Sequence, residues 1–302
     1  MKKRMAFQGF IPFLLLWGCF TATSAWGSEP LVGAAMCKGC HTGYYDSYLP
    51  SLHGQKAVPN SPANKNGCES CHGAGGDHVK KPSEKGSIIA FGKKTKDARV
   101  KSARCLACHE ESATAFWDLG KHERAGVSCD SCHTAHSTTK KNLKTREPEL
   151  CNTCHRDIAV QTGKQSHHPI KEMGMKCTSC RDPHGGFSAK MIKGTSTNEL
   201  CYQCHAEKRG PFMWAHPPVE ENCLSCHAPH GSNHSKLLTN RVPMLCQSCH
   251  NTAGHPSNAY TRFDTFSGPQ PSNRMFAHSC LNCHSNIHGN NGPSTRGKFN
   301  VR

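Results

Sequence analysis

CYQCHAEKRGPFMWAHPPVEENCLSCHAPHG, residues 201–231, contains the motif C-x-x-C-H twice. In such a motif the two cysteines can form thioethers with the vinyl groups of a haem, and the adjacent histidine can bind the haem iron. A single C-x-x-C pair is more often a zinc site or a redox-active dithiol. The number of copies in the rest of the chain therefore decides between these chemistries.

The chain contains ten C-x-x-C pairs, which together use every cysteine after Cys19. Nine pairs are followed directly by histidine, and the sixth by Arg181. Zinc sites do not require histidine after every second cysteine, so the repetition argues against a zinc-ribbon protein and predicts c-type haem attachment. The predicted thioether positions are Cys37, Cys40, Cys68, Cys71, Cys105, Cys108, Cys129, Cys132, Cys151, Cys154, Cys177, Cys180, Cys201, Cys204, Cys223, Cys226, Cys246, Cys249, Cys280 and Cys283. The predicted proximal iron ligands are His41, His72, His109, His133, His155, His205, His227, His250 and His284.

The remaining histidines follow a fivefold repeat. Units that begin near residues 37, 105, 151, 201 and 246 each read C-x-x-C-H, a spacer histidine, a second C-x-x-C and a trailing histidine. These histidines are candidates for the distal axial ligand, and bis-histidine ligation favours electron transfer over substrate binding. Spacing does not tell which histidine serves which haem, because ligands can cross between units. The candidates are the spacer residues His53, His122, His168, His216 and His255 and the trailing residues His78, His136, His184, His230 and His288, whereas His167, His234 and His278 fall outside the scheme.

Composition predicts the kind of fold. Leu, Ile, Val and Phe make up about 15% of the chain, below the ~20% at which charged chains tend to be disordered. Haems must therefore supply much of the apolar mass. We expect a multihaem cytochrome c of mostly irregular coil with short α-helices and little or no β-sheet, elongated as a haem wire of five di-haem repeats.

The first residues predict export. Lys2, Lys3 and Arg4 precede an apolar stretch from Phe10 to Phe20, and small residues follow, as in a secretory signal peptide over residues 1–27. The apolar stretch is shorter than the ~20 residues that span a bilayer. A lipoprotein cleavage box at LWGC, residues 16–19, is a weaker alternative, because Trp17 fits such a box badly. We expect the exported chain in the periplasm.

The exported chain is expected to have three parts. Residues 28–150 would form a first haem module with motifs 1–4, and residues 151–289 a second module with motifs 5–10. Residues 290–302 would form a flexible C-terminal tail.

The sixth site breaks the rule, because a guanidinium offers no lone pair to iron. Three interpretations stay open. The site can lack haem, it can carry a haem without the usual proximal ligand, or Arg181 can be a variant in a chain whose relatives have histidine. The flanking His168 and His184 fit the repeat, so the sequence predicts nine secure haem c groups and a compromised tenth at Cys177 and Cys180.

The chain has a formal net charge of +16. This excess does not indicate nucleic acid as a partner, because two propionates on each of ten haems would add about twenty carboxylates. The densest basic run, Lys80 to Lys101, is interpreted as a solvated or propionate-facing loop. Docking of an acidic partner is the alternative.

The motifs as a set resemble the periplasmic decahaem cytochromes of outer-membrane porin–cytochrome conduits, the MtrA/DmsE family (MtoA/PioA-like). The resemblance covers essentially the whole chain after the leader and is most specific at residues 201–231, at CQSCHNTAGHPSNAY (residues 246–260) and at CLNCHSNIHG (residues 280–289). It implies association with the outer membrane, where a haem wire passes through a β-barrel porin. The implied partners are that porin, an extracellular multihaem cytochrome, and periplasmic or inner-membrane cytochromes that donate or accept electrons. Arg181 departs from the family, which has histidine there.

Three functions are compatible with these observations. A non-catalytic conduit for extracellular electron transfer, in metal reduction or Fe(II) oxidation, agrees with the nearly full set of axial ligands. A multihaem reductase requires an open iron position, for which only the sixth site is a candidate. A freely diffusing periplasmic shuttle would need no barrel partner.

Overall fold

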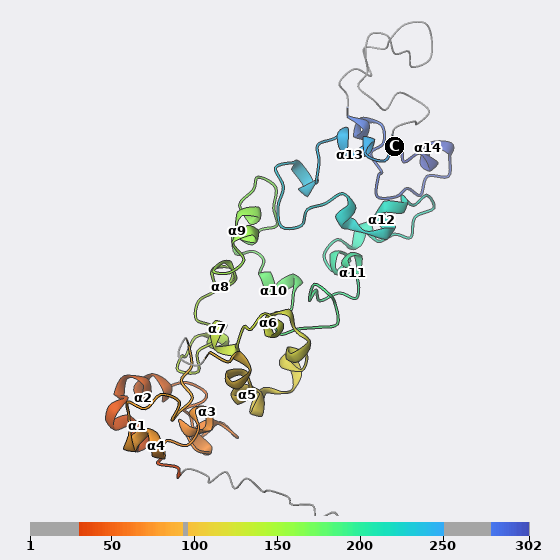
Figure 1. Cartoon of the computed structure of the whole chain (residues 1–302). Coiled ribbons are helices and arrows are strands. Elements are labelled where there is room, and N and C mark those ends of the chain that lie inside the picture. Colours follow the sequence, from red (N-terminus) through yellow and green to blue (C-terminus); the bar gives the residue numbers. More distant parts are fainter. Residues whose placement is uncertain (1–29, 93–95, 251–278, 302) are drawn as a thin grey trace, which may run out of the picture.

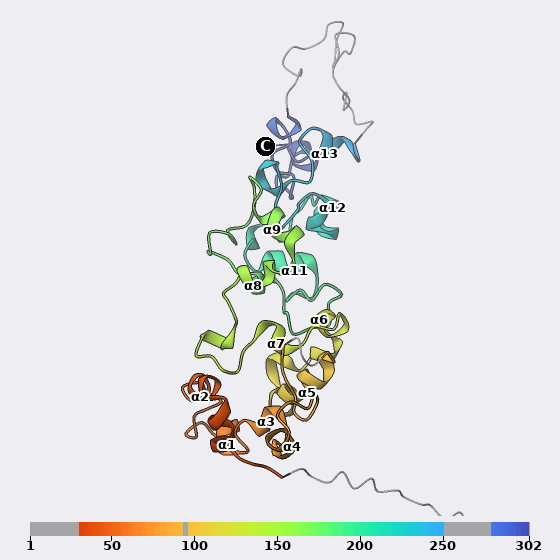
Figure 2. The same cartoon turned by 60° about the vertical axis from the view of Figure 1, so that its left-hand side comes forward.

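The structure is a computed structural model that describes residues 30–92, 96–250 and 279–301. The predicted leader, His255 and His278 lie outside these residues. The described chain is elongated, and its elements follow one another along the long axis in nearly the order of the sequence. Helices α1 to α4 lie at one end and α13 and α14 at the other (Figures 1 and 2).

The secondary structure consists of short helices, most of them a single turn. The α-helices are α1 (Ala34–Cys40), α2 (Thr42–Tyr48), α3 (Glu69–His72), α4 (Gly76–Lys80), α5 (Ala98–His109), α6 (Lys121–Arg124), α7 (Cys129–Cys132), α8 (Glu149–Asn152), α9 (Arg156–Thr162), α10 (Cys177–Cys180), α11 (Thr197–Tyr202), α12 (Pro217–Glu221), α13 (Met244–Gln247) and α14 (Thr295–Lys298). The 3₁₀-helices are η1 (Pro62–Asn64), η2 (Ser112–Thr114), η3 (Trp117–Leu119), η4 (Lys140–Asn142), η5 (Ala206–Lys208), η6 (Cys223–Ser225), η7 (Ser235–Leu237) and η8 (Cys280–Asn282).

Each cysteine pair lies on or directly beside one of these helical turns. In nine of the ten motifs, the amide of the residue after the second cysteine donates a turn hydrogen bond to the carbonyl of the first, as His133 does to Cys129 at 2.9 Å, and the remaining motif lies within α5. Residues three apart share a face of a helical turn, so both thiols point to the same side. The local turn thus presents two cysteines and the following side chain together.

No β-strand occurs among the described residues, where pairing is confined to isolated bridges. Three bridges recur at the same place in successive units, namely His133 with Leu143, Arg181 with Ile192 and His227 with Leu238. The prediction of a multihaem fold made of coil and short helices is confirmed. No helix of the described chain is long and apolar enough to cross a membrane.

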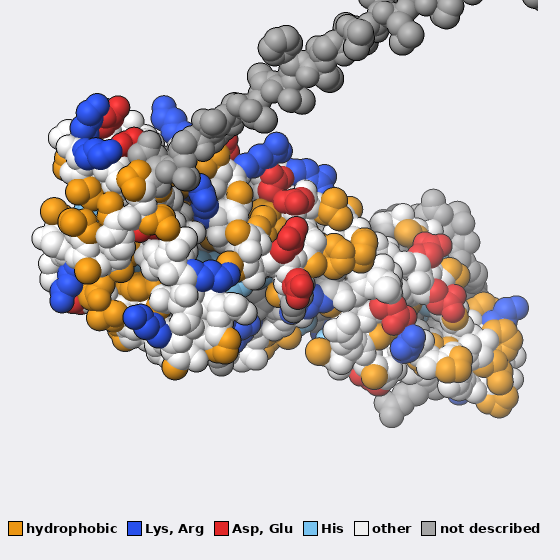
Figure 3. All heavy atoms as spheres, turned by 90° about the horizontal axis from the view of Figure 1, so that it is seen from below, with side chains coloured by type: hydrophobic (Ala, Val, Ile, Leu, Met, Phe, Trp, Pro, Cys, Tyr) orange, Lys and Arg blue, Asp and Glu red, His pale blue; other side chains and the backbone are white. Residues whose placement is uncertain are grey.

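The protein atoms form almost no apolar core of their own. Among the described residues, only Tyr48 and Trp117 are buried hydrophobic side chains, whereas Phe187 is 87% exposed. Figure 3 shows hydrophobic side chains scattered over one face between lysines and arginines. Such a chain cannot offset the conformational entropy of folding by packing its own side chains, which agrees with the prediction that haems complete the core.

The C-terminal segment differs from the predicted flexible tail. Residues 290–301 include α14 and pack against earlier parts of the chain: the Trp214 indole N–H donates to the carbonyl of Gly292 at 2.8 Å, and Asn290 forms a bridge with Trp214. Sequence reasoning missed these contacts because the segment has no apolar periodicity. The division into modules at residue 150 stays a prediction.

Glycines after three trailing histidines allow close packing. Gly185 has φ +122°, and an added Cβ would overlap the carbonyl oxygen of Phe116. A Cβ at Gly231 would overlap the carbonyl of Gln161, and one at Gly289 would overlap the ring of Phe212. Each contact joins the segment after a trailing histidine to the segment that leads to the spacer histidine of the preceding unit.

Replacing Gly185 with alanine is expected to lower the free energy of unfolding by about 1–3 kcal/mol, since the new Cβ meets a backbone carbonyl at a backbone angle that favours glycine. Denaturant unfolding of the holoprotein measures this change. Gly43→Ala in α2 is the matched control, because no atom lies within 4 Å of its added Cβ. Equal midpoints for the two variants would show that the close approach at Gly185 is unimportant.

Candidate haem sites

One continuous cavity connects all ten motifs. Its volume is about 4770 Å³, and its lining includes all twenty motif cysteines. Divided among ten motifs, this volume is about 480 Å³ for each, within the ~300–1,000 Å³ of pockets that hold one small molecule. The space therefore fits a row of cofactors attached at regular intervals.

Eight motif histidines each face one histidine from outside the motifs across this cavity. The distances between ring centroids are 6.2 Å for His41 and His78, 6.0 Å for His53 and His109, 6.2 Å for His72 and His136, 6.0 Å for His122 and His155, 6.1 Å for His133 and His184, 6.4 Å for His168 and His205, 6.2 Å for His216 and His250, and 6.1 Å for His227 and His288.

These distances match those of two imidazoles on one iron. A metal–imidazole bond is about 2 Å long and a ring nitrogen lies about 1.1 Å from the ring centre, so the centres of two opposed ligands lie about 6 Å apart. The observed distances of 6.0–6.4 Å leave room for one metal atom between the rings of each pair. The residues therefore fit bis-histidine haem.

The pairs cross between the repeat units. Four spacer histidines face the first motif of the following unit, as His53 of the first unit faces His109 of the second. Trailing histidines face the second motif of the preceding unit, as His184 of the third unit faces His133 of the second. At the N-terminal end, His41 instead faces His78 of its own unit.

Backbone carbonyls orient the spacer imidazoles. Nδ1 of His122 contacts the carbonyl oxygen of Pro183 at 2.8 Å, and Nδ1 of His168 contacts that of Pro229 at 2.8 Å. Each proline precedes a trailing histidine, namely His184 or His230. A proton held on Nδ1 leaves the Nε2 lone pair for a metal, so these contacts favour the tautomer that can ligate iron.

The other two spacer histidines of the described chain lack such a contact. Burial lowers the pKa of His53 and of His216, and the carbonyls of Ala135 and Ile287 oppose this shift. Both Nδ1 atoms are buried without a well-formed hydrogen bond. The carbonyl that precedes the trailing histidine thus forms a close contact with the spacer imidazole in two of the four units.

Motif histidines of the even-numbered sites have a similar support. Nδ1 of His72, His133, His227 and His284 contacts a carbonyl oxygen 8 to 17 residues further along the chain, at 2.7–2.9 Å. At the sixth site, Nη1 of Arg181 donates to the carbonyl of Lys190 in the same way. Sequence reasoning missed these acceptors, because backbone carbonyls have no signature in the choice of side chains.

Contacts between cysteines define the order of the sites. Within each unit the first cysteines of the two motifs are close enough to affect each other's pKa, in the pairs Cys37–Cys68, Cys105–Cys129, Cys151–Cys177, Cys201–Cys223 and Cys246–Cys280. Between units, burial and then the neighbouring second cysteine raise the pKa of Cys71, Cys132, Cys180 and Cys226, whose neighbours are Cys108, Cys154, Cys204 and Cys249. Motifs 1 to 10 therefore follow one another in space in the order of the sequence.

One group of side chains has the composition of a metal site. Possible ligand atoms of Glu147, Cys151 and Cys177 lie within 4.8 Å of one another. The two cysteines meet as their counterparts do in the other four units, and Glu147 accepts hydrogen bonds from Thr178 N and Oγ1 at 2.9 Å each. The repeat therefore accounts for the approach of the two cysteines, and the hydrogen bonds to Thr178 at the start of α10 account for the position of Glu147.

Two histidines that the repeat leaves out, His167 and His234, lie in the described chain, and His167 has an acidic partner. Nε2 of His167 lies 3.1 Å from a carboxylate oxygen of Glu172, and that contact is the main cause of its raised pKa. The amide of His234 donates to Ser232 Oγ. His230, in contrast, is a distal-ligand candidate and lies opposite the sixth motif. Burial lowers the pKa of His230, and the nearby charge of Arg181 lowers it further. His255 lies outside the described residues, so its role as a distal ligand stays a prediction.

The basic run from Lys80 to Lys101 ends in a buried ion pair. Nζ of Lys101, a residue only 8% exposed, lies 3.3 Å from the Asp130 carboxylate and donates to the carbonyl of Gly92. Lys80 and Lys81 are exposed and form ion pairs with Asp77 and Glu84. The lysines at the start of the run are therefore solvated, as predicted. Lys101, at its end, instead joins α5 to α7.

Known proteins share these patterns. A family described as a doubled CXXCH motif matches residues 167–210 and 216–255, and one described as cytochrome c-type protein NrfB-like matches residues 68–149. The chain is 41% identical over 268 residues to the multihaem cytochrome MtrA of Shewanella baltica (strain OS185), in an alignment that covers 87% of this chain and 80% of that protein.

Two more distant relatives are larger proteins. The C-type polyhaem cytochrome OmcB of Geobacter sulfurreducens (strain DL-1 / KN400) is 26% identical over 301 residues, which cover 85% of this chain and 36% of OmcB. The dissimilatory sulfite reductase MccA of Wolinella succinogenes is 24% identical over 216 residues, which cover 54% of this chain and 29% of MccA.

Fold, site geometry and motifs define a multihaem cytochrome of the c type, which binds haem c through its C-x-x-C-H motifs. Within that class, the sequence identity to MtrA and the share of both chains that the alignment covers determine the family. The chain belongs to the family of the multihaem cytochrome MtrA.

Crossed ligation can be tested with His53→Ala in the full chain. Loss of this imidazole is expected to convert one ferric haem per chain from low spin to high spin, as electron paramagnetic resonance (EPR) measures. The added signal should disappear when the third haem is also removed by Cys105→Ala and Cys108→Ala. Removal of the first haem by Cys37→Ala and Cys40→Ala is the control and should leave the signal in place. The opposite pattern would contradict crossed pairing.

Proposed function

We propose that this protein is a non-catalytic electron conduit that carries electrons through a row of covalently attached bis-histidine haems. The observation that carries the proposal is the row of motifs in which each motif has a cysteine beside a cysteine of the next, from the first to the tenth. Each haem c would supply a one-electron change of its iron. The chain's own residues fix the position of each group and supply its axial ligands.

The proposed ligand set follows the geometry of the pairs. The nine motif histidines bind from the proximal side, and the ten spacer and trailing histidines named above are the distal ligands, with His230 serving the sixth site and His255 the tenth. Two imidazoles close both axial positions, so such sites favour electron transfer over binding of substrates. Crossed ligands also tie each unit to the next, which keeps adjacent haems at a fixed separation.

The proposed place of action is the periplasmic side of the outer membrane, after removal of the leader. The family relation to MtrA and the similarity to OmcB support this placement. The proposed partners are an outer-membrane porin, an extracellular multihaem cytochrome and periplasmic or inner-membrane cytochromes. Metal reduction and Fe(II) oxidation use opposite directions of the same path.

Two other functions are distinguishable from the conduit. The similarity to MccA makes a reductase the alternative function. Among the described motifs only the sixth lacks its histidine, whereas eight of the nine motif histidines have an imidazole opposite, so the sixth site is the candidate for an open iron position. A freely diffusing shuttle would have no membrane partner. Co-purification of an outer-membrane β-barrel with the tagged protein would exclude the shuttle.

Interrupting the row in its middle tests the conduit. Cys151→Ala with Cys154→Ala removes the fifth haem, and extracellular reduction of an impermeant ferric acceptor is expected to fall at least 100-fold, because electron tunnelling falls steeply with distance. The assay uses a bacterium that lacks its own cytochrome of this family.

His167→Ala is the control, since this histidine contacts Glu172 and lies outside the ligand set. It should support the unmodified rate. The mass of the purified variant must show that only one haem is missing. Full extracellular reduction by the interrupted variant would overturn the conduit.

A further inference from the structure

The sixth motif keeps the backbone of a haem site although its histidine is replaced. The amide of Arg181 donates to the carbonyl of Cys177 at 3.3 Å, and α10 places Cys177 and Cys180 on one turn. Arg181 forms an isolated β-bridge with Ile192. The histidines at the same position of the fourth and eighth motifs, His133 and His227, form the equivalent bridges.

The loop after the motif has the same bonds in three units. The carbonyl of Lys190 accepts from Arg181, as those of Lys141 and Lys236 contact the Nδ1 atoms of His133 and His227. The guanidinium therefore takes the place and the hydrogen-bond partner of a proximal imidazole. It stays protonated and has no lone pair, so it cannot bind iron.

His230 is held on the opposite side as a distal ligand would be. The carbonyl of the preceding Pro229 contacts Nδ1 of His168 at 2.8 Å, and the following Gly231 packs against Gln161. Both contacts repeat those around His184, which lies 6.1 Å from its partner His133. The sixth site thus has one imidazole where its neighbours have two.

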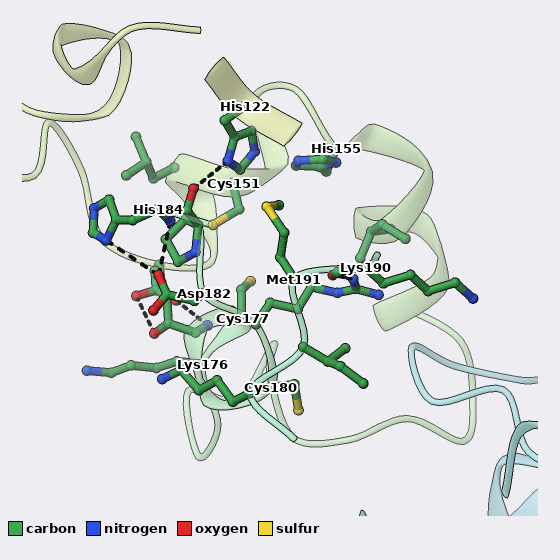
Figure 4. A pocket seen from close by; sticks show the side chains of 18 of the residues that line it. His122, Cys151, His155, Lys176, Cys177, Cys180, Asp182, His184, Lys190 and Met191 are labelled. Carbon is green, nitrogen blue, oxygen red and sulfur yellow. Dashed lines mark hydrogen bonds and ion pairs between the residues drawn. The ribbon is translucent and has the colours of Figure 1, made fainter. Parts of the chain in front are cut away.

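Neighbouring side chains do not replace the missing ligand. Met191 lines the cavity, but its sulfur accepts a hydrogen bond from the amide of Lys121 at 3.4 Å. Figure 4 shows Met191 near Cys177 and Cys151, while the side chain of Lys190 runs away from the cysteines. Met191 occupies the loop position that Asn142 has after the fourth motif and Leu237 has after the eighth. Neither of these two residues is a candidate ligand.

We infer that a haem attached at Cys177 and Cys180 is bound by His230 alone, and that its open axial position beside Arg181 binds a small anion of the class of cyanide, azide or nitrite. The inference rests on the proposed haem c at this site. Arg181 has donors besides the one used by Lys190, and a charge-assisted hydrogen bond from a cation stabilises a bound anion. Binding is reversible coordination and requires no oxidant or reductant.

The test uses the full ferric holoprotein, with haems counted by intact mass and cyanide as the probe. Ten haems are expected, with one high-spin EPR signal per chain that converts to low spin as one cyanide binds. Arg181→His is expected to abolish both the high-spin signal and cyanide binding. Arg181→Gln should keep the high-spin signal and weaken cyanide binding at least tenfold, because the charge is lost.

Two controls separate the effect of the Arg181 charge from other changes at the open axial position. Carbon monoxide is neutral, so its affinity for the reduced protein should not change when Arg181→Gln is introduced. Met191→Leu should leave the ferric spectrum unchanged. Nine haems by mass, ten haems without a high-spin signal, or a spectrum altered by Met191→Leu would each overturn the inference. Nine haems would also leave a gap in the row at the sixth site. The conduit is nevertheless tested separately, because the fifth-haem variant measures extracellular reduction directly.

Discussion

The pairing of imidazoles from separate repeat units, which we propose to be the two axial ligands of one haem iron, is the interaction on which the rest of the structure depends. Opposed rings with centroids 6.0–6.4 Å apart recur along the described chain, and most join segments of different units. His53 and His109, for example, are 56 residues apart in the sequence. Ligation can therefore fix long-range contacts that the side chains alone do not make.

This constraint accounts for the unusual composition. A chain with two buried hydrophobic side chains among its described residues lacks the usual driving force for folding. The cavity that joins the motifs replaces the core, and its lining of cysteines and histidines is filled when haems are attached. The short helices and the backbone carbonyls then have one task, which is to position the candidate ligands. The carbonyl of Pro183, for example, orients the imidazole of His122. Glycines such as Gly185 permit the backbones of successive units to approach.

The sequence predicted the class of fold and the motif residues, because thioether attachment requires cysteines and histidine at fixed local spacing. It could not predict the pairing of His53 with His109, since ligand crossing depends on the path of the coil between units. The packed segment at residues 290–301 was also missed, because its contacts with Trp214 involve backbone carbonyls and an indole. At Arg181 the sequence left three interpretations open, and the repeated loop geometry around Lys190 favours a haem site with an altered ligand.

The dependence of the fold on haem is tested most directly by small-angle X-ray scattering of the chain from residue 28, produced with and without c-type haem maturation. Without haem, we expect a radius of gyration close to the ~58 Å of an unfolded chain of this length, together with a far-UV circular dichroism spectrum that lacks helix. The holoprotein should be much more compact and give one reproducible profile. A haem-free chain with the same radius of gyration and helix content as the holoprotein would contradict this dependence.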